Sequence, residues 1–140
     1  VLSVRGSLIS ESGSGIFNEG DIYVSEDVEN NSGDVMFLNN LPGTVILDGG
    51  NQFVRGTDSI SFYNLRLSGV LLSEKELDLS VSMTNELDLN DQVLETHEYK
   101  AYVLNPFVGS VLYNLGFCAS DMLGGYLMRR TNSTGEYEYP

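Results

Sequence analysis

Short runs of alternating apolar and polar residues, separated by turn residues about every ten positions, constrain the fold of this chain more than any other feature. In residues 77–83 every second residue is apolar, which is the period of a β-strand with one buried face. Residues 60–62 alternate likewise, but residues 65–67 resume on the opposite parity. This shift predicts a bend or bulge near Tyr63 and Asn64.

Turn signals, and the lack of helix patterns over most of the chain, locate the other predicted elements. Asp48-Gly49-Gly50-Asn51 is a strong turn signal, and Asn105-Pro106 closes a predicted strand. The further predicted strands are residues 45–47, 53–54, 99–104 and 111–113. No segment before residue 107 has the pattern of an amphipathic helix of normal length, and residues 121–129 are predicted to form a short helical turn broken by Gly124-Gly125.

Two internal echoes favour stacked coils. Residues 16–22 and 28–35 share a branched aliphatic, an asparagine, a Gly-Asp step and another branched aliphatic, with the two glycines 13 residues apart. Residues 76–79 and 86–89 match at an offset of ten. Similar turn residues recur in adjacent coils of a solenoid. We therefore predict an all-β chain that forms a parallel β-helix or β-solenoid of short strands with an irregular C-terminal segment, and keep an antiparallel β-sandwich as the alternative.

Composition excludes several classes of function. The 140 residues include 41% hydrophobic residues, which suffice for a core. Acidic residues number 20 and basic residues 7, so the net charge of −13 argues against nucleic acid or an anionic membrane as a partner. No apolar run is long enough to cross a bilayer as a helix, which predicts no membrane insertion. One cysteine can form neither an internal disulfide nor a Cys-cluster zinc site.

The two parts of the chain differ in regularity. We predict β-solenoid coils over residues 1–106 and a closing segment over residues 107–140 that leads into a further strand or domain. Residues 135–139 have the pattern of a strand that is beginning. The chain starts at Val1 without a leader pattern, which favours a fragment of a much longer chain.

These motifs resemble the coil repeats of very large secreted surface proteins of Bacteroidetes-type bacteria. The resemblance covers roughly residues 15–140. The segments that carry it are residues 43–49 (a G-x-V-x-L-x-G strand), 52–56, 61–67, 86–96, 116–129 and 137–140. The resemblance implies a parallel β-helix-like module of an exported adhesin or appendage protein, located outside the cell or on the bacterial surface. The resemblance implies no catalytic residues in this chain.

Candidate catalytic residues do not form a recognisable motif. Asp88 and Asp91 are the best candidates for a paired acid and base, but loop spacing does not fix the gap that such chemistry needs. The only histidine, His97, has no nucleophile motif around it. We therefore predict no catalytic residues and a protein that is not an enzyme.

Calcium is an alternative for the acidic segments 11–34 and 71–98. Asp88, Asn90 and Asp91 offer side-chain oxygens, but the EF-hand spacing and its glycine are missing. We favour a solvated acidic face that discourages wrong strand pairing, and we predict no metal site and no cofactor.

Aromatic residues and modification signals remain. Eight tyrosines and no tryptophan favour tyrosines that cap coil ends or line an interface, with a glycan-stacking platform as the alternative. Cys118 lies in an apolar setting that predicts a buried, inert thiol, with an intermolecular disulfide as the minority alternative. Asn30 and Asn132 begin N-glycosylation patterns, and Ser59 lies in a bacterial O-glycosylation-like motif.

Together these observations predict a structural and interaction module of a large extracellular filament, appendage or adhesin. Its expected partners are further copies of itself or neighbouring domains of the same long chain, because β-solenoid ends expose unpaired strand edges. A glycan- or surface-binding adhesive module, assisted by calcium, is the alternative. A polysaccharide-active enzyme is the third hypothesis.

Overall fold

A computed structural model describes residues 1–13, 15–38, 41–121, 124–132 and 136–140, which form 14 β-strands and one short 3-10 helix. The elements are β1 (Leu2–Val4), β2 (Leu8–Ser10), β3 (Asp21–Val24), β4 (Val28–Asn30), β5 (Thr44–Leu47), β6 (Gln52–Gly56), β7 (Ile60–Leu67), β8 (Glu74–Leu77), β9 (Val81–Asp88), β10 (Val93–Glu95), β11 (Lys100–Val103), η1 (Val108–Ser110), β12 (Val111–Leu112), β13 (Phe117–Ala119) and β14 (Tyr126–Arg129). In this part of the chain no helix is long and apolar enough to span a membrane.

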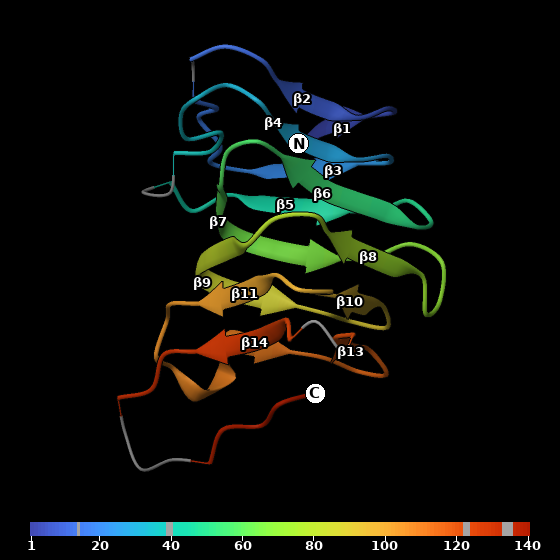
Figure 1. Ribbon diagram of the computed structural model, residues 1–140, viewed down its shortest axis with the longest axis vertical. Helices are drawn as coiled ribbons and strands as arrows, with labels where there is room; N and C mark the ends of the chain where they lie inside the picture. The colour runs from blue at the N-terminus through green and yellow to red at the C-terminus, as the bar shows by residue number, and fades with distance from the viewer. Residues whose placement is uncertain (14, 39–40, 122–123, 133–135) are drawn as a thin grey trace.

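The strands form two parallel sheets that run the length of the molecule (Figure 1). One sheet has the order β1-β3-β5-β7-β9-β11-β14, with β12 beside β9, and the other has the order β13-β10-β8-β6-β4-β2. All strand pairings among the described residues are parallel. The predicted parallel β-solenoid is therefore confirmed, and the antiparallel β-sandwich is excluded.

The true coil period is longer than the repeats found in the sequence. Ile22 pairs with Leu2, 20 residues earlier, and Val54 pairs with Val28, 26 residues earlier. Leu77 in β8 and Leu87 in β9 belong to opposite sheets, so the ten-residue echo spans half a coil. The 13-residue echo does not follow the coils either, because it aligns β3 with residues 34–37 and β4 with residues 15–17, which precede β3.

The larger sheet bends in the middle of its two longest strands, β7 and β9. The pairing register of β7 with β9 shifts between Phe62 and Asn64, which confirms the predicted bulge. The first half of β9 pairs with β11, and its second half pairs with β12. The bend therefore divides the larger sheet into two halves, one of which ends in β11 and β14.

An asparagine ladder joins successive coils at this bend. The Asn85 amide donates to Asn64 Oδ1 over 2.7 Å, and the Asn105 amide donates to Asn85 Oδ1 over 3.0 Å. Asn64 in turn donates to Thr44 Oγ1 over 3.4 Å. An amide side chain both donates and accepts, so a column of asparagines satisfies its own polar atoms between coils.

The core consists of inward-facing columns, one residue per coil. Phe62 is fully buried, and its ring lies 5.4 Å from that of Phe37 in the coil above. This column runs through Ile16, Phe37, Phe62, Met83, Val103 and Arg129. Alternation along each strand puts these residues inside and their sequence neighbours outside.

The C-terminal third differs from two expectations. Tyr126–Arg129 form strand β14 rather than part of a helical turn, and residues 122–123 lie outside the described residues. At Gly125 the chain passes so close to the preceding coil that a Cβ atom would lie 2.4 Å from the His97 carbonyl oxygen. Residues 136–140 form no strand, contrary to the strand pattern of residues 135–139. The division at residue 106 stays a prediction; β12, β13 and β14 lie beyond it in the two sheets.

Candidate interaction surfaces

The first coil leaves part of the core open. Leu2 pairs with the buried Ile22 and lies in the same inward column, yet its exposed fraction is 53%. Val4 and Leu8 are only partly buried against the core. No strand of the described residues pairs with the outer edges of β1 and β2. An unpaired strand edge beside open apolar side chains is a template for another β-strand.

The other end of the stack is closed by an arginine. Arg129 occupies the inward position below Val103, and it is buried. Its Nη1 donates to the Glu138 carbonyl oxygen over 2.7 Å, and its Nη2 donates to the Val108 carbonyl oxygen over 2.5 Å. A guanidinium with five donors satisfies backbone carbonyls that a further coil would otherwise cover.

Tyrosines of the C-terminal segment complete this closure. The Arg129 guanidinium lies 5.1 Å from the ring centre of Tyr137 and 5.9 Å from that of Tyr139. The Tyr137 hydroxyl donates to the Pro106 carbonyl over 2.9 Å, and the Tyr113 hydroxyl donates to Glu138 Oε2 over 2.6 Å. These tyrosines lie at a coil end, where the sequence predicted them.

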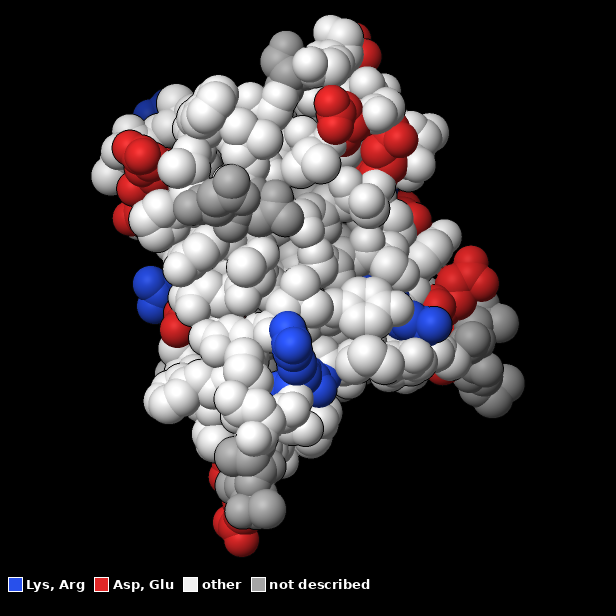
Figure 2. Space-filling view, turned by 90° about the vertical axis from the view of Figure 1, so that its left-hand side faces the viewer, with Lys and Arg blue, Asp and Glu red and all other residues white. Residues whose placement is uncertain are grey.

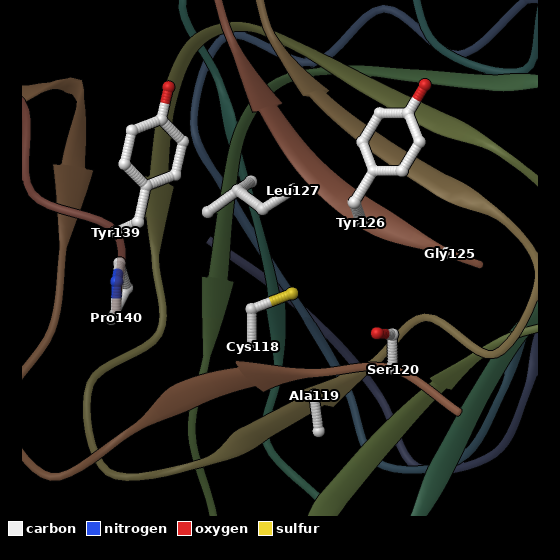
Figure 3. Close-up of a pocket in the computed structure, with 8 residues that line it drawn as sticks. All are labelled: Cys118, Ala119, Ser120, Gly125, Tyr126, Leu127, Tyr139 and Pro140. Atoms are coloured by element: carbon white, nitrogen blue, oxygen red, sulfur yellow. The ribbon is translucent and has the colours of Figure 1, made fainter. Parts of the chain in front are cut away.

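A small hollow of about 200 Å³ remains between β13, β14 and the last two residues (Figure 3). Cys118 lies in its wall, and the Cys118 backbone N–H donates to the Pro140 carbonyl over 3.3 Å. Burial, with a smaller contribution from Glu95, raises the pKa of the Cys118 thiol to about 11. The thiol is therefore protonated at neutral pH, as expected for an inert cysteine.

The carboxylates proposed for catalysis or calcium are engaged in structural contacts. Asp88 Oδ2 accepts a hydrogen bond from Arg66 Nε over 3.0 Å, and Asp88 Oδ1 accepts one from the Asn90 backbone N–H over 3.0 Å. Asp91 Oδ1 accepts from the Leu115 backbone N–H over 3.3 Å. Among the described residues no group of three or more His, Cys, Asp or Glu side chains could hold a metal ion. That the protein is not an enzyme and has no cofactor both stay predictions.

The modification signals have different surroundings. Asn30 is fully buried, and its amide donates to the Asp34 and Ser59 carbonyl oxygens over 3.0 and 3.1 Å. Its amide nitrogen is therefore inaccessible to glycosylation in the folded chain. Ser59 and Asn132 are exposed, and the two residues that complete the Asn132 pattern lie outside the described residues.

His97 joins carboxylates from three successive coils. Its Nε2 lies 3.1 Å from Glu76 Oε2, and its Nδ1 lies 3.9 Å from Glu95 Oε1 and 3.6 Å from Asp121 Oδ2. The hydrogen bond with Glu76, followed by attraction to Glu95, Glu76 and Asp121, outweighs desolvation and raises the pKa of His97 above its ordinary value of 6.5. This cluster is a stabilising contact for the protonated imidazole.

This cluster predicts a pH-dependent contribution to stability. The raised pKa means that the folded chain holds a proton that the unfolded chain releases above pH 6.5. The contribution is fully present below pH 6.5 and is lost as pH rises through the folded-state pKa. We expect His97→Asn, which tolerates the left-handed backbone at this position (φ 48°), to remove up to about 1 kcal/mol at pH 6 and less at pH 8.

Urea unfolding of both proteins at pH 6 and pH 8 measures this difference. An equal effect of His97→Asn at both values would contradict the assignment of the proton to His97.

The sequence did not reveal that Lys75 is buried. Its Nζ donates to the carbonyl oxygens of Gly49 and Gly50 and to Gln52 Oε1, over 2.9, 2.5 and 2.7 Å. Gln52, also buried, donates to the Val24 carbonyl oxygen over 2.8 Å. Lys75 and Gln52 thus tie β8 to the turn and strand of the coil above.

Comparison of the chain with protein-family models, curated proteins and solved structures found no match. The resemblance of residues 15–140 to the coil repeats of Bacteroidetes-type surface proteins therefore stays a prediction.

Proposed function

We propose that this chain is a structural and interaction module of a large extracellular filament, appendage or adhesin. In this role it provides a stiff β-solenoid that associates through its first coil and performs no catalysis. The observation that carries the proposal is the open first coil, in which Leu2 faces the core column and is half exposed.

The two ends of the solenoid differ in a way that supports this role. The first coil presents unpaired edges of β1 and β2, whereas Arg129 and the last five residues cover the end of the stack. A second copy docked on the first coil would pair both edges and bury Leu2. Contact between two first coils would therefore bring one open edge against another.

A charged side chain in place of Leu2, in the open first coil, tests this role. We expect the purified chain to form dimers whose fraction rises with concentration, because each first coil offers edges and apolar side chains to the other. Leu2→Asp introduces a charge that must remain hydrated, so it is expected to give monomers. Sedimentation equilibrium in 0.15 M salt measures the masses.

The matched control is Val70→Asp, which places the same charge on an exposed aliphatic residue in the turn before β8. This variant is expected to associate like the unmodified chain. Monomers of the unmodified chain at all concentrations, or equal effects of the two substitutions, would contradict the proposed interface.

A further inference from the structure

One half of the larger sheet carries an unusual set of outward side chains on β11 and β14. Lys100 pairs with Tyr126 and Tyr102 pairs with Met128, while the inward neighbours Ala101 and Val103 are fully buried. The next outward positions on the two strands are Leu104 and Arg130. We call these six outward residues the β11–β14 face: Lys100, Tyr102, Leu104, Tyr126, Met128 and Arg130.

This face has the opposite charge to the rest of the molecule. It contains two basic residues and no acidic one, in a chain with 20 acidic and 7 basic residues. Figure 2 shows basic groups in the lower half of one side: the central one is surrounded by uncharged surface, and the outer ones lie beside acidic groups. Arg55 and Arg66 are neutralised by carboxylates, whereas Arg130 has no ion pair within the described residues.

The face is also hollowed and rich in apolar area. A depression of about 230 Å³ is lined by Tyr102, Leu104, Met128 and Arg130 together with parts of Val103 and Arg129. Leu104, Tyr126 and Met128 are about two-fifths exposed. Exposed aromatic and aliphatic side chains beside a guanidinium are typical of a binding surface.

The arrangement of these groups indicates what kind of ligand fits. Leu104 is the neighbour of Arg130 and lies four residues after Lys100. The backbone positions that carry the two cations are therefore roughly 13 Å apart along the strand direction. The positions beside Tyr102 on the neighbouring strands carry hydroxyl groups, because Tyr102 pairs with Ser82 in β9 and Ser82 pairs with Ser61 in β7. An extended ligand with repeated anionic groups, rings that have an apolar face, and many hydroxyl groups matches this arrangement of cations, tyrosines and serines.

We propose that the β11–β14 face binds an acidic polysaccharide. Arg130 and Lys100 bind carboxylates of separate sugar units, and the guanidinium is suited to a bidentate contact. The ring of Tyr102 packs against the apolar face of a sugar. The ring centre of Tyr126 lies 5.2 Å from Lys100 Nζ, and this ring holds that ammonium at the face. At 0.15 M salt the Debye length is about 8 Å, so acidic residues that lie farther than this from Arg130 are largely screened from its ligand.

This activity is separate from the association of first coils, and its test uses other residues. Isothermal titration of the purified chain with an oligogalacturonate and an oligomannuronate, in 0.15 M salt, is expected to show binding to at least one of them. The methyl-esterified oligogalacturonate is the matched neutral ligand, and a glutamate-rich peptide is the matched anionic ligand without sugar rings. Both are expected to bind at least tenfold more weakly than the acidic oligosaccharide that binds best.

Variants locate the binding to this face. Arg130→Gln combined with Lys100→Gln is expected to weaken binding at least tenfold, because both carboxylate contacts are lost. Tyr102→Ala is expected to weaken binding by a factor of at least three, because a stacking ring is lost. Arg5→Gln, which removes an exposed arginine of the first coil, is expected to change the dissociation constant less than twofold.

Circular dichroism of each variant confirms that the fold is retained. The proposal is overturned by the absence of binding to both acidic oligosaccharides, or by equal binding of the esterified ligand or the acidic peptide. An equal loss of affinity in Arg5→Gln would show unspecific attraction and would overturn it too.

Discussion

Lys75→Met is expected to lower the free energy of unfolding by about 3 kcal/mol, because it leaves buried carbonyl oxygens without their donor. The Lys75 ammonium is the donor to Gly49, Gly50 and Gln52. Methionine has a similar length and no donor, so the effect is that of lost hydrogen bonds rather than of an empty cavity. Urea unfolding at pH 7 measures the change.

The control is Lys100→Met, which removes the only other lysine at a surface position. Its ammonium lies over the ring of Tyr126 on the surface, so a much smaller loss than in Lys75→Met is expected. Equal losses in the two variants would contradict the structural role of Lys75.

Lys75 also makes stability depend on pH in the alkaline range. Burial, partly offset by attraction to Asp48, lowers the pKa of Lys75 from 10.5 to about 8. Between these values the unfolded chain holds a proton that the folded chain releases, so stability rises with pH. We expect this rise between about pH 8 and 10.5 in the difference between the unmodified chain and Lys75→Met. A flat difference would show that the ammonium keeps its ordinary pKa in the fold.

Phe62→Ala is expected to lower the free energy of unfolding by about 3–5 kcal/mol, because it leaves a cavity in the middle of the core column. Phe62 is fully buried, contacts the ring of Phe37 above and pairs with Met83 below. A solenoid coil is stabilised mainly by its neighbours, so a gap in a central coil weakens two interfaces at once.

Phe17→Ala is the matched control, because the Phe17 ring is 78% exposed. Its expected change is within about 0.5 kcal/mol. Urea unfolding of both variants under one set of conditions gives the comparison. A loss of less than 1 kcal/mol in Phe62→Ala would contradict the inward column.

The local elements were predictable where one principle determined the structure. The parity change between residues 60–62 and 65–67 located the irregularity of the sheet. There the pairing moves from Phe62–Met83 to Asn64–Glu86 and leaves one residue of β7 opposite two of β9. Asp48 to Asn51 were predicted as a turn, because these residue types favour turn backbone, and they connect β5 to β6.

The coil period was missed because coils differ in length. Stacked partners are 19 to 26 residues apart, so no fixed period fits the sequence, and half-coil echoes were easier to find. The asparagine ladder was a usable signal: Asn64, Asn85 and Asn105 are spaced at 21 and 20 residues. Recurrent asparagines at about this spacing would have located the stack and its bend.

The two buried cations could not be predicted from the sequence. Lysine and arginine are ordinarily exposed, and their burial depends on carbonyl groups that come from other coils. Lys75 meets the turn of the preceding coil, and Arg129 meets η1 and the C-terminal segment. The β11–β14 face was equally hidden, because its six residues become neighbours only when residues 100–104 and 126–130 stack.

Electron microscopy of the purified chain tests most directly whether the solenoid associates through its first coil. The account predicts elongated particles about twice the length of one chain, which fall apart into single particles in Leu2→Asp. Single particles at every concentration would contradict association through the first coil. Long fibres would contradict the closure of the other end by Arg129 and the last five residues.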